Sequence, residues 1–193
     1  MIQPVDDHDI SMLVSEVGAI QRLATVDFHL IAVKADNWNH DLSPWKAPAV
    51  FGDDEFGDGA KETLTEILNL CQSKSRRYYL GGYSLAGLFS LWGAFQTDAF
   101  AGIAAASPSL WFPGFLGYMK KNSIQSNKVY LSLGDKEEKT KNPVMSQVGG
   151  CIRECHTLLV GQGINCTLEW NKGGHFNEPE LRTAKAFAWV LNT

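Results

Sequence analysis

Residues Tyr78–Gly87 read YYLGGYSLAG, an apolar stretch of strand length that passes through two glycines into a serine. Directly after this serine, apolar residues recur at the spacing of one helix face: Leu88, Leu91, Trp92 and Phe95. The residues two positions before and two positions after Ser84 are small, which leaves room for a tight turn. The stretch therefore predicts a strand, a sharp turn with Ser84 at its apex, and a helix.

This turn has the form of a nucleophile elbow, in which a strained strand-to-helix turn lifts a serine hydroxyl above the sheet. Gly82 and Ala86 meet the demand for small neighbours. The free N–H groups of a helix N-terminus favour developing negative charge, so the Leu85 N–H is a candidate oxyanion donor. The competing interpretation is a glycine-rich turn that only packs a helix against a strand.

Strand-length apolar stretches alternate with helical patterns along the whole chain, which predicts the α/β class. We expect one domain, residues 1–193, with a three-layer fold of about six mostly parallel strands and helices on both faces. The expected strands are Ile2–Val5, Phe28–Lys34, Arg77–Gly81, Gly102–Ala106, Lys128–Leu133 and Cys166–Trp170.

Helices are expected from near Ile10, directly after Ser84, and around the apolar face Val148, Ile152, Cys155 and Leu159. A last helix is expected with Asn177 as its cap, Pro179 in its first turn and one face made of Leu181, Ala184, Ala188 and Leu191. The longest irregular segment runs from Asp36 to about Gly59, and loops of that length are usually functional.

Composition excludes several classes of protein. Apolar residues make up 45% and charged residues 20%, as in soluble globular proteins. The net charge of -4 leaves no basic stripe for nucleic acid. No apolar run approaches the ~18 residues of a membrane span, and the acidic N-terminal residues do not suit a signal peptide. We expect a cytoplasmic protein that binds neither nucleic acid nor membrane.

Two further groups of polar residues follow strands after the elbow, in the chain order serine, acid, histidine. One expected strand runs into Gly134-Asp135-Lys136-Glu137-Glu138, and another into a glycine turn that ends at His175. Carboxyl ends of parallel strands meet at one edge of the sheet. A serine needs a histidine to accept its proton, and the histidine needs a carboxylate to orient it. The residues alone leave open whether Asp135, Glu137 or Glu138 is that carboxylate.

The sequence resembles an esterase family of α/β hydrolases that includes siderophore esterases, feruloyl esterases and S-formylglutathione hydrolase (esterase D). The resemblance covers most of the chain and rests on the elbow and on four further motifs. These are Asp41-Leu42-Ser43-Pro44, Ser107-Pro108-Ser109-Leu110-Trp111-Phe112, Gly134-Asp135-Lys136-Glu137 and Gly174-His175.

By position, the resemblance implies that Ser84 is the nucleophile, His175 the base and Glu137 the acid. It also implies that Trp111 and the loop around Trp38 and Trp45 line a substrate pocket. The chain departs from the family where an arginine usually precedes the Asp-Leu-Thr-Pro loop, since residues 37–40 hold none, and where Ala86 replaces the commoner glycine. It also starts almost inside its first parallel strand, so we expect a minimal version of the fold.

The cluster Asp6-Asp7-His8-Asp9 admits several interpretations. It could be a metal site or the Asp-x-Asp of a haloacid-dehalogenase phosphatase, or it could cap the next helix. In a hydrolase fold this loop supplies the second oxyanion N–H, from Asp7 or His8. Cys151, Cys155 and His156 lack ordinary zinc spacing. Neither a P-loop nor a dinucleotide fingerprint is present, so no metal or organic cofactor is expected.

Together these features predict hydrolysis of small-molecule carboxylic esters with small or aromatic acyl groups, through an acyl-serine intermediate. Two alternatives stay open: a thioesterase or acyltransferase that uses the same triad, and a non-catalytic binding protein of the same fold. The strand Phe28–Lys34 is expected at a sheet edge, where a long apolar strand needs covering. A homodimer is one way to cover it.

Overall fold

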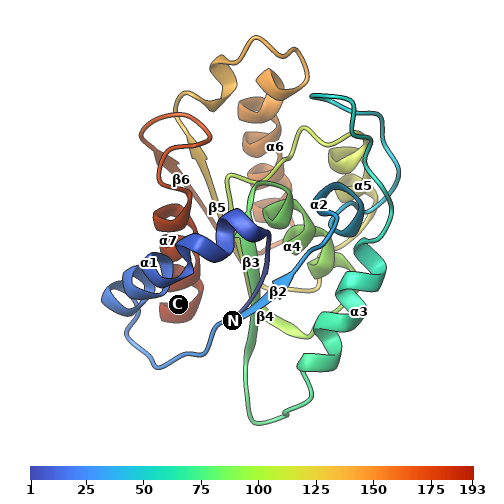
Figure 1. Cartoon of the computed structure of the whole chain (residues 1–193). Helices are drawn as coiled ribbons and strands as arrows, with labels where there is room; N and C mark the ends of the chain where they lie inside the picture. The colour runs from blue at the N-terminus through green and yellow to red at the C-terminus, as the bar shows by residue number, and fades with distance from the viewer.

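The computed structural model describes residues 1–193, which form one six-stranded sheet with the order β2-β1-β3-β4-β5-β6 (Figure 1). All neighbouring strands are parallel. The six predicted strands are confirmed, with shifted ends. Their bounds are β1 (Ile2–Val5), β2 (Ile31–Lys34), β3 (Tyr78–Tyr83), β4 (Phe100–Ala106), β5 (Lys128–Gly134) and β6 (Asn165–Asn171).

Helices cover both faces of the sheet, as predicted (Figure 1). One face packs against α1 (Asp7–Leu23) and α7 (Pro179–Asn192). The other packs against α3 (Ala60–Leu70), α4 (Ser84–Gln96), α5 (Phe115–Lys121) and α6 (Val148–Gly161). Shorter helical turns are α2 (Trp38–Asp41), η1 (Glu137–Lys139) and η2 (Met145–Gln147). None of the helices is long and apolar enough to cross a membrane.

Small residues bring α7 close to the strand that leads to Ser84. A Cβ added at Gly81 would lie 2.7 Å from both Ala104 on β4 and the Phe187 ring on α7. Ala104 and Phe187 are fully buried. Because close-packed interiors leave no slack for extra atoms, a larger residue at position 81 would push α7 away from β3. The packing therefore fixes the start of the elbow.

Two helix starts differ from the prediction. α1 begins at Asp7, not near Ile10, because Asp6 caps it and exchanges two side-chain hydrogen bonds with Asp9. α7 is not capped by Asn177: its cap position is Glu178, in a left-handed conformation. The Asn177 side chain instead accepts a hydrogen bond from the Gly174 N–H at 2.7 Å and so closes the preceding turn.

The expected buried face of α7 is confirmed in part, since Ala184 and Ala188 are buried. Leu181 and Leu191 are only partly buried. Further buried positions are Arg182, Phe187 and Val190, of which Phe187 and Val190 belong to the hydrophobic core on this face of the sheet. α7 packs against both the sheet and α1, so more than one stripe of its surface is covered. A single-stripe pattern does not describe a helix in that position.

The edge strand β2 is shorter than expected, and its last residue is charged. β2 lies at the sheet edge as predicted, but only Ile31–Lys34 pair with β1. Lys34 forms an ion pair with Asp7 at 2.9 Å. A short strand ending in a charged lysine is a common way of protecting an edge. The predicted homodimer therefore has less apolar strand to cover.

Glu16 provides a stability prediction. It is 4% exposed on α1, and its carboxylate accepts only the 3.3 Å hydrogen bond from Gln3. Burial raises its pKa to about 8, with Asp9 and Glu180 contributing. The folded pKa exceeds the unfolded one, so this group's contribution is present at acid pH and is lost as pH rises towards 8.

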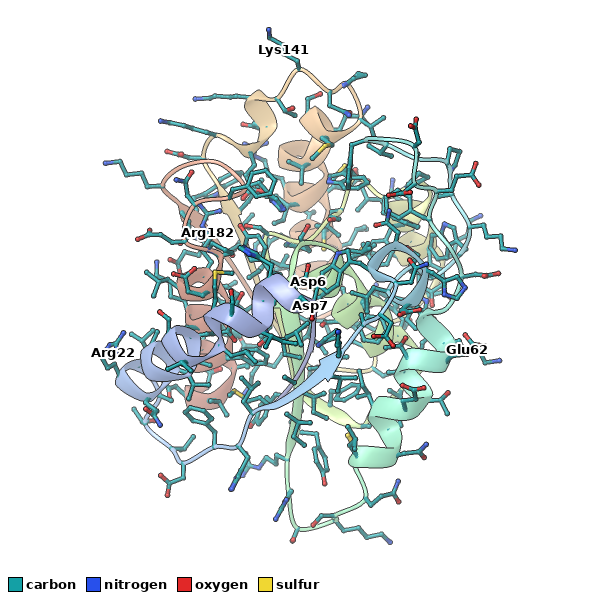
Figure 2. The ribbon with its side chains drawn as sticks, in the orientation of Figure 1. Asp6, Asp7, Arg22, Glu62, Lys141 and Arg182 are labelled. Atoms are coloured by element: carbon teal, nitrogen blue, oxygen red, sulfur yellow. The ribbon has the colours of Figure 1, made fainter.

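We expect Glu16→Gln to stabilise the protein by on the order of 2–4 kcal/mol at pH 8.5 and by less at pH 5.5, given ~1.4 kcal/mol per pKa unit. Urea unfolding at both pH values measures this. The matched control is Glu62→Gln on the exposed surface of α3 (Figure 2). An equal gain at both pH values would contradict the proposed cause.

Candidate active site

Ser84 lies at the junction of β3 and α4, with a left-handed backbone φ of 55°. Such a conformation is strained for a residue other than glycine. The turn needs small neighbours: a Cβ at Gly82 would lie 2.6 Å from the Ala86 Cβ. Ala86 itself is accommodated, which explains why it can replace the commoner glycine. The geometry is that of the predicted elbow.

His175 contacts the Ser84 hydroxyl. It follows β6 after a turn in which Gly173 has a φ of 106°, a conformation that favours glycine. The His175 Nε2 lies 3.0 Å from Ser84 Oγ, and its Nδ1 lies 2.7 Å from Glu137 Oε2. An ionised carboxylate can only accept, so Nδ1–H donates to Glu137 and Nε2 accepts from the serine. Three side chains thus form one hydrogen-bonded chain.

Glu137 is 9% exposed, and its other oxygen, Oε1, has three donors. They are the Gly134 N–H at 2.7 Å, the Ser107 hydroxyl at 2.8 Å and the Arg182 guanidinium at 2.9 Å. Burial alone would raise the pKa of Glu137. The hydrogen bond and charge of His175, together with the hydrogen bonds from the Gly134 N–H and the Ser107 hydroxyl, outweigh burial and lower the pKa below its ordinary value. The carboxylate is therefore held ionised beside His175.

The other two carboxylates of this turn have different partners. The Asp135 carboxylate accepts a 2.8 Å hydrogen bond from the Gly173 N–H and so ties the β5 turn to the β6 turn. Glu138 forms an exposed ion pair with Arg153 at 3.2 Å. Of the three candidates left open by the residues, only Glu137 touches His175.

Arg182 and Tyr83 also lie next to Glu137 and His175, and the sequence did not predict either of them. Arg182 is 2% exposed and donates to the Tyr83 hydroxyl at 3.1 Å and to the Gly174 carbonyl at 2.9 Å. Tyr83 donates to the His175 carbonyl at 2.6 Å. Burial and the Glu137 charge raise the pKa of Tyr83 to about 12. A signal for Arg182 was present, since it shares a helix face with Ala186 and Val190.

Arg182→Met is expected to destabilise the protein by about 3–5 kcal/mol, because removing one partner leaves the other charge buried and unpaired. The matched control is Arg153→Met, which breaks the exposed pair with Glu138 and should cost under about 1 kcal/mol. Urea denaturation measures both. Similar losses for the two variants would show that the buried pair contributes no more than a surface one.

The segment after β4 lies against the serine from another side. Ser109 Oγ is 3.2 Å from Ser84 Oγ, and the Ser109 N–H donates to the Ser84 carbonyl at 3.1 Å. Ser107 has a left-handed φ of 41°. The motif around residues 107–112 therefore supports the elbow and directs Trp111 towards the site.

Two cavities open onto Ser84 and His175. One has a volume of about 400 Å³ and an apolar lining that includes Trp38, Phe51, Phe56, Leu85, Trp111 and Met145. The other has a volume of about 470 Å³ and a lining that includes Asp6, Asp9, Glu178 and Glu180. A third cavity, of about 410 Å³, lies around Met1 and Arg77 and does not include the serine.

The predicted pocket tryptophans separate in the structure. Trp38 lines both cavities next to Ser84, and Trp111 lines the apolar one. Trp45 lines neither: its indole N–H donates to the Pro113 carbonyl at 2.9 Å, and its ring stacks on Phe115. The expectation that Trp45 lines the pocket needs correcting, because α5 holds this ring away from the serine.

The candidate oxyanion donors lie in the first turns of two helices, where backbone N–H groups have no acceptor within the helix. Leu85 follows Ser84 in α4 and lines the apolar cavity. Asp7 begins α1, and its neighbours Asp6 and His8 line the acidic cavity beside Ser84. The Asp7 carboxylate turns outward to Lys34. Figure 2 shows Asp6 and Asp7 at the N-terminal end of α1.

No group of three or more His, Cys, Asp or Glu side chains has an arrangement that could hold a metal ion. This applies to the cluster from Asp6 to Asp9, whose residues cap α1, and to the cysteines and His156 on α6.

No protein-family model matches the sequence. Comparison with curated proteins gives no significant match. Solved structures do match. The siderophore hydrolase EstA of Aspergillus nidulans is 19% identical with a TM-score of 0.70, over 99% of this chain and 82% of that one. An IroE-like serine hydrolase of Shewanella oneidensis is 16% identical with a TM-score of 0.73, over 97% and 69%.

An enterochelin esterase of Shigella flexneri is 15% identical with a TM-score of 0.66, and the match covers 98% of this chain but only 50% of that one. At these identities the similarity concerns the fold. The chain has the α/β-hydrolase fold that the sequence predicts.

Proposed function

We propose that the protein hydrolyses carboxylic esters through an acyl-serine intermediate, with Ser84 as nucleophile, His175 as general base and Glu137 as orienting acid. The observation that carries the proposal is the chain of hydrogen bonds of 3.0 and 2.7 Å that joins these three side chains at a cavity. The similar structures are named hydrolases and esterases, which agrees with it.

The chemistry proceeds in two steps. Ser84 Oγ attacks the ester carbonyl carbon while its proton passes to His175 Nε2. The bond from carbon to the leaving oxygen then breaks, and the proton passes from His175 to the departing alcohol. In the second step His175 accepts a proton from water, whose oxygen attacks the acyl carbon. The bond from the acyl carbon to Ser84 Oγ then breaks, Ser84 Oγ regains a proton from His175, and the carboxylic acid departs.

The fixed groups around the site have separate tasks in this mechanism. The Glu137 carboxylate holds His175 in the tautomer that accepts at Nε2 and stabilises the imidazolium that forms. The N–H groups of Leu85 and Asp7 are proposed to stabilise the oxyanion, each at a helix N-terminus. Trp38 and Trp111 are proposed to contact the acyl group in the apolar cavity.

Covalent labelling tests the proposal. A fluorophosphonate probe should modify Ser84 and no other residue, because only an activated serine attacks it at a useful rate. Peptide mass spectrometry identifies the modified residue. His175→Ala should abolish labelling while circular dichroism stays unchanged. Absence of labelling in the folded wild type would show that the serine is not activated.

The apolar cavity leads to a prediction about acyl chain length. A volume of about 400 Å³ suits a planar aromatic or short acyl group. We expect p-nitrophenyl benzoate and butyrate to be hydrolysed with kcat/KM about 10-fold or more above that of the palmitate ester, since added methylenes find no further enclosed surface. Comparable rates for palmitate would contradict this assignment.

A further inference from the structure

The two cavities that share Ser84 and His175 have different chemical character. Both are lined by Trp38 and Phe176, so they meet at the serine. The apolar cavity has no carboxylate in its lining. The other cavity has four: the cap residue Asp6 and Asp9 at the start of α1, and the cap residue Glu178 and Glu180 at the start of α7. An ester bound at Ser84 extends from the carbonyl carbon in two directions, one for each cavity.

The four carboxylates have no lysine or arginine partner in the protein, and the cationic form of His8 is the group whose charge acts on Asp9. None takes part in an ion pair, and neither lysine nor arginine lines the cavity. Lys34, on the neighbouring strand β2, is paired with Asp7. The Asp6 and Asp9 carboxylates each accept a hydrogen bond from the backbone N–H of the other residue. The side chains of Glu178 and Glu180 make no hydrogen bond to the protein. No lysine or arginine therefore neutralises the negative potential of the cavity.

One of these carboxylates, that of Asp9, is partly buried in the wall of the cavity. Burial raises the pKa of Asp9 to about 6, and the Asp6 charge adds to the effect. The Asp9 carboxylate is ionised above this pH. The two imidazoles present are His8, which is exposed, and His175, whose Nε2 faces the serine.

Aromatic rings also line this cavity, independently of the carboxylates. They are Trp38, Tyr83 and Phe176. Phe176 is 92% exposed directly after the histidine. Aromatic faces attract cations, above all quaternary ammonium groups.

From these contacts we propose that the acidic cavity binds a positively charged leaving group, so that the preferred substrates are esters of an ammonium alcohol with an aromatic or short acyl acid. The inference rests on the proposed function, because Ser84 and His175 identify the cavity as the place of an ester. The carboxylates and aromatic rings of the cavity select esters whose alcohol part is positively charged. An anionic alcohol would meet four like charges there.

A pair of isosteric esters tests the proposal. Benzoylcholine and 3,3-dimethylbutyl benzoate have the same shape, but the second has carbon in place of the charged nitrogen. Clefts lined by one sign of charge raise encounter rates by about 10–10³, so kcat/KM should be about 10-fold or more higher for benzoylcholine at low salt. High salt should reduce the preference, since these charges are partly exposed.

Two double variants separate the local charges from the overall charge. Glu178→Gln/Glu180→Gln removes two carboxylates of the cavity without touching the caps of α1. Glu62→Gln/Glu66→Gln makes the same change in net charge on exposed positions of α3, across the sheet from α1 (Figure 2). The first should lower the preference for benzoylcholine by about threefold or more. The second should leave the preference unchanged.

The outcomes distinguish this inference from the proposed function. Equal kcat/KM for the two esters, with normal hydrolysis of both, would overturn the inference and leave the esterase function standing. If neither ester is hydrolysed, the esterase function fails, and calorimetric binding of benzoylcholine to Ser84→Ala decides the inference alone. Binding that weakens in the Glu178/Glu180 background but not in the Glu62/Glu66 background supports it. Binding that is undetectable, or equal in both, overturns it.

Discussion

Ser84→Ala is expected to lower kcat for a good aryl ester by about 10⁴-fold or more, because no other group at the site can form the acyl intermediate. Ser109 is no substitute. Its hydroxyl lies beside that of Ser84, at 3.2 Å, but the His175 Nε2 points to Ser84. Without a base, a serine hydroxyl is a weak nucleophile.

The same variant should keep the stability of the wild type within about 1 kcal/mol, as for most substitutions that leave packing intact. The Ser84 hydroxyl contacts only His175 and Ser109, and alanine keeps the strained φ of 55° as it is. Initial rates of p-nitrophenyl butyrate hydrolysis measure the loss of activity, and urea unfolding measures the stability. Ser75→Ala, in the exposed loop before β3, is the control. If Ser84→Ala retains activity within about tenfold of the wild type, when loss of a triad member costs orders of magnitude, the mechanism is wrong.

The fold was predictable because its decisive signals are local. The glycines and alanine around Ser84 and the apolar helix face that follows come from one stretch of the chain, and the structure has the strand, turn and helix there. The ends of the strands were harder to predict. Residues 28–30 have the apolar character of a strand, yet they do not pair with β1, since pairing depends on a neighbour distant in sequence.

The residues around Ser84 and His175 were harder to predict, because contacts between segments distant in sequence place them. Arg182 reaches Glu137 across 45 positions and Tyr83 across 99. A single sequence indicates that a charged residue shares a buried helix face, but it does not indicate the partner. Trp45 illustrates the opposite error. A tryptophan in a long loop is a reasonable pocket residue, but this one packs against α5.

Of the three carboxylates in the turn after β5, only that of Glu137 reaches His175. This contact leads to the second large prediction. Glu137→Gln is expected to lower kcat by on the order of 10⁴, the loss found when a triad carboxylate becomes an amide. The amide would present an N–H or a neutral oxygen to His175 Nδ1, at the present 2.7 Å contact. The histidine tautomer that accepts from Ser84 would then no longer be favoured.

Asp135→Asn should cost far less, because that side chain accepts from the Gly173 N–H and an amide oxygen can do the same. Glu138→Gln should be nearly silent, since only the exposed pair with Arg153 is lost. Steady-state kinetics on all three variants, each checked by urea unfolding, compares them directly. Glu137→Gln also leaves Arg182 buried without its anion, so a loss of stability accompanies the loss of activity. Measuring kcat well below the unfolding midpoint keeps the two effects apart. If Asp135→Asn is the most damaging in folded protein, the acid is Asp135; if all three are mild, Ser84 and His175 act as a dyad.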